Sequence, residues 1–250
     1  MNKNSNNKLL NLYKDQGYFL INQFFKKKEI SLISNQLKNY HKMKCDSYFD
    51  RNGKIRRLEK FYNKTKDLKK LNSKILLLLK KIFGCSFIIF KDKYNFKPPN
   101  GEGFDAHYDG VYFFKINNKK NKGWYKYASS FVNVLIAFDN CTKKNGTLQL
   151  SKEHKLSFTQ MYKLTKKNGT PNLKDSISKN LKFKSIILKK GDLCIFSNRC
   201  PHRSYKNKSK SNRKIFYYTY NKSIDGDNYA KYYVDKKKSK SKFKALAGEI

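Results

Sequence analysis

The residues best suited to chemistry lie in two short stretches that are far apart in the chain. In residues 104–110, His107 and Asp109 stand two positions apart. Side chains alternate along an extended strand, so both would point to the same face and could bind one metal ion. His202, in residues 200–204, is the candidate for a third ligand. The other two histidines, His41 and His154, are interpreted as solvated side chains.

Two histidines and one carboxylate on one face of a metal, with open positions opposite, are typical of non-haem Fe(II) oxygenases. Those that use 2-oxoglutarate also need a cation for its far carboxylate, which an arginine fork matches well. Arg213 is one of six arginines and begins an apolar run eleven residues after His202. If His202 ends one strand and Arg213 begins the next, both can face one barrel mouth. Spacing alone leaves a second interpretation open, in which the pair at His107 and Asp109 is a chance occurrence.

The composition is that of a globular chain with an unusual excess of lysine. The 250 residues carry a formal net charge of +39, from 57 Lys and Arg against 18 Asp and Glu. Such a charge suits nucleic acid or an acidic membrane surface. Lysine, however, is spread over every segment, and readers of nucleic acid rely on arginine. We therefore attribute the charge to compositional bias and expect no specific nucleic-acid partner.

The five cysteines and the apolar runs indicate the cellular compartment in which the protein is expected. No CxxC pair occurs, so a disulfide framework or a zinc site is not expected, and a reducing cytoplasm fits. The polar N-terminus lacks the apolar core of a signal peptide. The longest aliphatic run, residues 75–79, is far too short for a membrane span. The oligomeric state is left open.

Apolar periodicity predicts helices first and strands afterwards. Helical spacing covers residues 28–42 and 67–83, with Gly84 as a C-cap, and a helix start precedes the first short strand within residues 8–25. The predicted strands are 17–21, 86–90, 93–97, 131–138, 147–150, 185–188, 193–196 and 214–220. Residues 44–60 are interpreted as a loop or lid, 115–126 as an exposed loop, and 158–182 as an uncertain segment that could form an active-site loop. The fold class is mainly β with flanking helices, a barrel or sandwich.

Several blocks in the same order resemble the phytanoyl-CoA dioxygenase family of Fe(II)/2-oxoglutarate-dependent oxygenases. They are residues 17–25, 104–109, 131–139, 145–155 and 190–213, which together span about residues 15 to 235. The resemblance implies a single oxygenase domain over residues 1–250 with a double-stranded β-helix (jelly-roll) core at 85–222. Residues 1–84 would be a helical part packed on the barrel, and 236–250 a basic tail.

The resemblance also implies the site residues. His107, Asp109 and His202 would bind Fe(II), and Arg213 would bind 2-oxoglutarate with help from Ser204. O2 would be the oxidant and ascorbate a supporting reductant. Lys93 and Asn95 stand where members often contact the co-substrate or substrate, although Lys93 could equally be an ordinary exposed lysine. Because Asp109 is present, the chain resembles a hydroxylase and not a related halogenase, which lacks this carboxylate.

The substrate is less defined. Residues 89–99 and 232–236 are similar to a subgroup that includes 2-aminoethylphosphonate dioxygenases. That likeness suggests hydroxylation of an unactivated C–H bond in a small anionic or zwitterionic metabolite, while a fatty acyl-CoA stays open. A nucleic-acid oxidative demethylase is an alternative, but Thr219 stands where such enzymes usually carry a second arginine. A non-catalytic jelly-roll binding protein is a further alternative.

Overall fold

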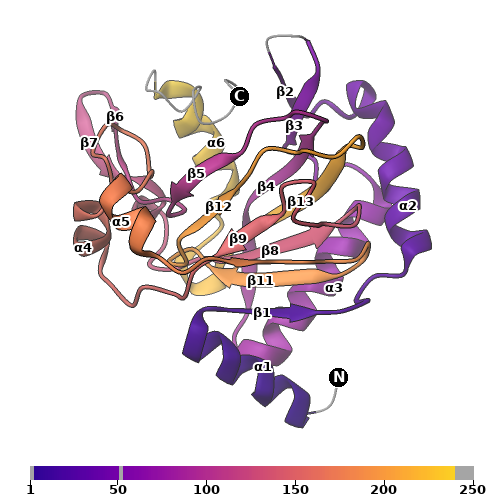
Figure 1. Ribbon diagram of the computed structural model, residues 1–250, viewed down its shortest axis with the longest axis horizontal. Coiled ribbons are helices and arrows are strands. Elements are labelled where there is room, and N and C mark those ends of the chain that lie inside the picture. The colour runs from indigo at the N-terminus through magenta and orange to yellow at the C-terminus, as the bar shows by residue number, and fades with distance from the viewer. Residues whose placement is uncertain (1–2, 51–52, 240–250) are drawn as a thin grey trace.

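Two antiparallel sheets form the centre of the computed structural model, which describes residues 3–50 and 53–239 (Figure 1). The large sheet has the strand order β1 (Tyr18–Ile21), β11 (Leu193–Ser197), β8 (Val132–Ala137), β13 (Arg213–Lys222), β4 (Phe87–Lys97), β3 (Ile55–Glu59) and β2 (Asp46–Phe49). The small sheet has the order β10 (Lys184–Ser185), β9 (Leu148–Leu150), β12 (His202–Ser204) and β5 (Phe104–His107). A separate hairpin joins β6 (Phe113–Ile116) and β7 (Lys119–Lys122). This is the jelly-roll arrangement expected from the sequence.

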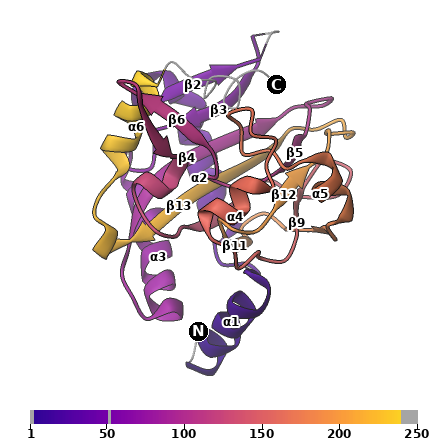
Figure 2. The same ribbon diagram turned by 90° about the vertical axis from the view of Figure 1, so that its left-hand side faces the viewer.

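Six α-helices and three short 3₁₀ turns surround the sheets in the described ranges. The α-helices are α1 (Lys3–Gln16), α2 (Lys27–Gln36), α3 (Lys66–Phe83), α4 (Phe158–Lys163), α5 (Asp175–Asn180) and α6 (Tyr229–Lys238). The 3₁₀ turns are η1 (Leu37–Met43), η2 (Gly123–Lys126) and η3 (Ser223–Asp225). Figure 2 shows α3 and α1 on one side of the large sheet, and α4 and α5 near the small sheet. No described helix has both the length and the apolar character needed to cross a membrane.

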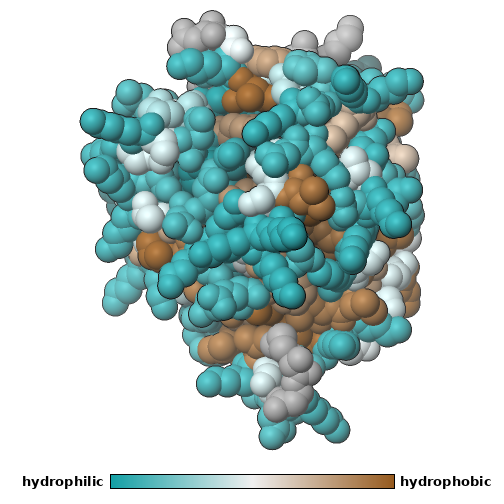
Figure 3. Space-filling view, turned by 90° about the vertical axis from the view of Figure 1, so that its right-hand side faces the viewer, coloured by the Kyte–Doolittle hydropathy of each residue, from teal (hydrophilic) through white to brown (hydrophobic). Residues whose placement is uncertain are grey.

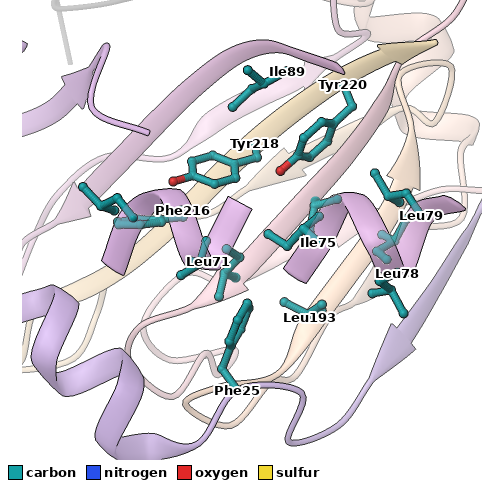
Figure 4. Packing of buried hydrophobic residues seen from close by; sticks show 14 of the residues in the cluster. Phe25, Leu71, Ile75, Leu78, Leu79, Ile89, Leu193, Phe216, Tyr218 and Tyr220 are labelled. Atoms are coloured by element: carbon teal, nitrogen blue, oxygen red, sulfur yellow. The ribbon is translucent and has the colours of Figure 1, made fainter. Parts of the chain in front are cut away.

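Helix α3 forms where the sequence predicts it, because both of its ends are capped. The Thr65 hydroxyl accepts a hydrogen bond from the Leu68 N–H at 3.2 Å. Gly84 takes a left-handed conformation with φ of 69° and its N–H bonds to Lys80 O. Between these caps, the apolar stripe with Leu71 and Ile75 packs on the outer face of the large sheet (Figure 4).

The inner faces of the two sheets enclose a second, smaller apolar cluster. It combines large-sheet residues such as Leu135 and Ile215 with small-sheet residues such as Leu148 and Leu150. This packing fixes the spacing of the sheets, so residues at their ends are held in a defined relative position. The candidate site lies at one such end.

Several segments differ from the sequence-based expectation. Residues 44–60, expected to be a loop, form the β2–β3 hairpin at the edge of the large sheet. Residues 115–126 contain the end of β6, all of β7 and η2 instead of a plain loop. Strands 86–90 and 93–97 are one strand, β4, because Lys91 and Asp92 stay in the ladder with β13. The segment 1–84 also adds β1, β2 and β3 to the large sheet.

Two further segments were expected to be irregular. Within residues 158–182 lie the short helices α4 and α5. The basic tail was expected from residue 236, but Lys236–Lys238 belong to α6 and the side chain of Lys236 is half-buried. Residues 240–250 of that tail lie outside the described residues.

Candidate active site

The pairing of two small-sheet strands brings the candidate metal ligands together. His107 ends β5 and His202 begins β12, and the two residues are direct partners across the antiparallel ladder. Asp109 follows β5 and is 9% exposed. The nearest ligand atoms of these three side chains all lie within 4.8 Å of one another, with His202 Nε2 at 3.7 Å from Asp109 Oδ2.

Hydrogen bonds orient both imidazole rings. His107 Nδ1 lies 2.7 Å from the Asp105 carbonyl and His202 Nδ1 lies 3.0 Å from the Cys200 carbonyl. A carbonyl only accepts, so each Nδ1 must carry the proton, which leaves a lone pair on Nε2. This is the usual way in which a protein prepares a histidine to bind a metal.

The charge state of the three groups also suits a metal. Burial, followed by the nearby His202 ring, lowers the pKa of His107 to about 3. Burial likewise lowers the pKa of His202. Burial alone would raise the pKa of Asp109, but His202 and Lys93 outweigh it and the net shift is downward. Two neutral imidazoles and a carboxylate are therefore ready at neutral pH, a donor set that fits Fe(II).

Asp109 is held by a pair of residues that the sequence did not indicate. Asn133 on β8 donates from Nδ2 to Asp109 Oδ2 at 2.9 Å. The Thr219 hydroxyl donates to Asn133 Oδ1 at 2.7 Å, which fixes the orientation of the amide. Thr219 thus supports the carboxylate from behind. These partners come from adjacent large-sheet strands, so only their register places them there.

Arg213 and Ser204 lie on the wall of the same cavity. Arg213 begins β13, is 3% exposed, and donates from Nη1 to the Gly146 carbonyl. Its Nε has no hydrogen-bond partner among the described residues. The Ser204 hydroxyl accepts a 2.8 Å hydrogen bond from Lys97 Nζ, a contact absent from the sequence-based hypothesis. A buried guanidinium with an unsatisfied nitrogen is suited to a carboxylate ligand.

A cavity of about 490 Å³ extends from the His107, Asp109 and His202 group. Lys93 and Asn95 of β4 both line it, together with Arg57, Lys91 and Lys236, which the sequence analysis did not single out. Lys93 is half-buried, so its interpretation as an exposed lysine is wrong. The aromatic residues on the cavity wall are Phe104, Tyr112, Trp124, Tyr217 and Tyr232.

His154 also differs from its expected solvated state. It is half-buried, and its Nδ1 forms a short hydrogen bond with the hydroxyl of Tyr108, the residue between His107 and Asp109. His41 is exposed, as expected. Thus His154 supports the loop that carries the candidate ligands, and it lies outside the group of three.

A jelly roll with this donor set is the architecture of a non-haem Fe(II) oxygenase. The sequence model of the phytanoyl-CoA dioxygenase (PhyH) family matches residues 13–215. The chain therefore belongs to the PhyH family.

Two curated relatives are named for phosphonate chemistry. A methylphosphonate hydroxylase from Gimesia maris is 29% identical over 169 residues, which cover 67% of this chain and 58% of that protein. A 2-aminoethylphosphonate dioxygenase from the uncultured bacterium HF130_AEPn_1 is 26% identical over 161 residues, covering 64% and 55%. The chain thus spans little more than half the length of the curated relatives it matches.

Solved structures agree with the fold. EctD from S. alaskensis with bound Fe superposes with a TM-score of 0.68 at 14% identity, covering 87% of this chain and 77% of that one. The epimerase SnoN in complex with Fe3+, alpha ketoglutarate and nogalamycin RO gives 0.66 at 12% identity, covering 88% and 84%. At these identities the likeness establishes the jelly-roll fold.

Proposed function

We propose that the protein is an Fe(II)- and 2-oxoglutarate-dependent dioxygenase that hydroxylates an unactivated C–H bond of a small anionic or zwitterionic metabolite. The observation that carries this proposal is the convergence of His107, Asp109 and His202 next to a cavity lined by Arg213. A facial donor set beside a buried guanidinium is what iron and a 2-oxoacid co-substrate need.

Each residue has a part in this reaction. His107, Asp109 and His202 would hold Fe(II), while Arg213, with Ser204, would hold the far carboxylate of 2-oxoglutarate. With O2, bound iron and 2-oxoglutarate would supply the chemistry that converts a C–H bond to C–OH, while 2-oxoglutarate is converted to succinate and CO2. Ascorbate would keep the metal reduced. The surrounding aromatic side chains shield the reacting centre from water.

The cavity supports a small substrate in preference to a nucleic acid. Its volume is in the range of pockets for small ligands, about 300–1,000 Å³. Oxidation of a base would need a channel with a basic track for the backbone. Thr219, in the position usual for a second arginine, is already bonded to Asn133. The names of the two phosphonate-related proteins support an anionic substrate, and the five free cysteines support a reducing cytoplasmic location.

The test is succinate formation from 2-oxoglutarate with Fe(II) and ascorbate, for the wild type and for His202→Ala. We expect turnover in the wild type and a loss of about a hundredfold or more in the variant, with loss of bound metal measured separately. His41→Ala, on an exposed turn, is the matched control and should keep both. A wild-type protein that binds neither Fe(II) nor 2-oxoglutarate would be a non-catalytic binding protein.

A further inference from the structure

Two lysine ammonium groups reach the cavity without a carboxylate in direct contact among the described residues. Lys91 and Lys93 are two positions apart on β4, so their side chains share the face that lines the cavity. Lys91 is 8% exposed, and its Nζ lies 5.3 Å from the ring centroid of Trp124 and 5.2 Å from that of Tyr232. Lys93 Nζ lies 5.1 Å from the ring centroid of Tyr217. Within residues 3–50 and 53–239, neither ammonium forms a hydrogen bond or a salt bridge.

This burial is unfavourable for charged groups. An ammonium taken from water needs a hydrogen-bonded partner, and the faces of aromatic rings replace only part of its hydration. Burial lowers the pKa of Lys91, and burial together with Lys91 lowers the pKa of Lys93 to about 7. An anionic ligand between the two lysines would supply the missing partner.

The carboxylates in reach of the lysines are already engaged. Glu59 is fully buried and bound to Lys236, with Arg57 Nη1 at 3.6 Å. Asp109 belongs to the candidate metal site. Asp92 accepts hydrogen bonds from the N–H groups of three successive residues, Lys60, Phe61 and Tyr62, and from the hydroxyls of Tyr229 and Tyr233.

Arg57 adds a third cation to this end of the cavity. It lies opposite Asn95 in the β3–β4 ladder and donates from Nε to the Asn95 side-chain oxygen at 3.2 Å. That contact holds its guanidinium against the same strand face as the two lysines. If the negative charge of Glu59 is counted against Lys236, the three positive charges of Arg57, Lys91 and Lys93 remain. One carboxylate ligand, with a single negative charge, would not balance them.

This end of the cavity also lies next to the candidate metal ligands. The backbone N–H of Trp124 donates to the backbone carbonyl of Gly110, which directly follows Asp109. Gly110 has a φ of 78°, and a Cβ built on it would lie 2.6 Å from the Trp124 side chain. Only glycine permits this close approach. Lys91, Trp124 and Asp109 line the same cavity of about 490 Å³, and this volume favours a substrate whose remaining group is small.

We propose that Lys91, Lys93 and Arg57 form a subsite for the doubly charged tetrahedral head group of the substrate, a phosphonate or a phosphate monoester, and hold a short alkyl group against the metal site. The proposal rests on the proposed function. Three oxygens and two charges match three cations that line one cavity, whereas a carboxylate has one charge and two oxygens. Among the described residues, the carboxylates near this end (Glu59, Asp92 and Asp109) already have cationic, hydrogen-bonding or candidate metal-binding roles, so the head group needs no neighbouring amine.

Trp124 offers a direct readout because it is the only tryptophan in the chain. Its fluorescence would be recorded while methylphosphonate, methyl phosphate or acetate is added to protein loaded with Zn(II) and 2-oxoglutarate, since zinc prevents turnover. We expect the two tetrahedral dianions to bind about tenfold or more tighter than acetate. Equal affinities for all three would overturn the proposal, and a preference between the first two would identify the source of the head group.

A second series tests the amine. Ethylphosphonate and 2-aminoethylphosphonate should bind within about threefold of each other, because no free carboxylate awaits the ammonium. An amine that tightens binding by about tenfold or more would overturn this part of the proposal.

A pair of variants tests the role of Lys91. Lys91→Met approximately keeps the length of the side chain and should weaken the binding of methylphosphonate by about tenfold or more. The affinity for 2-oxoglutarate, measured by calorimetry, should change by no more than about twofold. Lys115→Met, at an exposed position on β6, should change neither. Unchanged methylphosphonate affinity in Lys91→Met would refute the subsite. If that variant does not fold, the wild-type ligand series decides. A wild-type protein that does not bind 2-oxoglutarate would instead contradict the proposed function.

Discussion

At the residue scale, Arg213 is the buried cation on the cavity wall that is proposed to bind the far carboxylate of 2-oxoglutarate. Its Nη1 is bonded to the Gly146 carbonyl, which sets the plane of the guanidinium, and its Nε has no hydrogen-bond partner within the part of the chain that the structure describes. A planar fork in a fixed plane can bind a carboxylate through two parallel hydrogen bonds. Lysine has the same charge without this geometry.

We expect Arg213→Lys to raise the Kd for 2-oxoglutarate by about tenfold to a hundredfold, because a bidentate contact is replaced by a point charge. Calorimetry with Zn(II)-loaded protein measures this directly. The matched control is Arg203→Lys, since the Nε of Arg203 is already bonded to Gln149 and its guanidinium lies over the Phe183 ring. Equal losses in both variants would contradict a specific role for Arg213.

The sequence was sufficient to propose the candidate metal ligands, and insufficient for the residues that hold them in place. Residue type and spacing select His107, Asp109, His202 and Arg213 as candidates, and the resemblance to the family assigns their proposed roles. The contact from Asn133 to Asp109 follows from strand register, and register is decided by packing along two whole sheets. No local pattern marks Asn133 as a partner of Asp109, which follows a strand of the other sheet.

At the scale of elements, the β2–β3 hairpin shows why some strands escape prediction. Its buried positions include Arg56, Arg57 and Glu59, whose charges conceal the period of two that normally reveals a strand. Helix α3 was predictable because its caps and apolar stripe are all local features. A strand buried by ion pairs can be recognised only when its partners are known, here α6 and β4.

Glu59 gives this hairpin a distinct dependence on pH. Burial alone would raise its pKa, but Lys236, Lys91 and Arg57 outweigh it and lower the pKa from 4.5 to about 2. A lowered pKa means that the ionised carboxylate contributes stability above pH 4.5, and that this contribution is lost as the pH falls toward 2.

We therefore expect Glu59→Gln to lower the free energy of unfolding at pH 7 by an amount on the order of 3 kcal/mol, and the gap to close in acid. Urea unfolding at several pH values between neutral and acid measures this difference. Glu102→Gln removes a carboxylate from an exposed pair with Lys206 and should have little effect at any pH. A gap at Glu59 that stays constant with pH would mean that its packing, and not its charge, stabilises the hairpin.

At the scale of the whole molecule, the net charge of +39 comes from lysines spread along the whole chain. On the face shown in Figure 3, hydrophilic residues cover most of the area and are not gathered along a single groove. Dispersed charge of this kind creates a long-range attraction for any small anion, without choosing among anions. Choice among anions would fall to the few cations inside the cavity. The two effects differ in range and therefore in their response to salt.

For an anionic substrate such as methylphosphonate, we expect kcat/KM to fall by about tenfold as NaCl rises from about 20 to 300 mM, while kcat changes by no more than about twofold. Screening weakens the encounter between protein and anion but leaves the bound complex largely unaffected. Chloride could also compete inside the cavity, and Lys91→Met separates the two causes. Screening by the whole surface persists in this variant, whereas competition at Lys91 disappears. A kcat/KM that does not depend on salt in either protein would show that the dispersed lysines contribute nothing to substrate capture, and that the surface charge reflects composition alone.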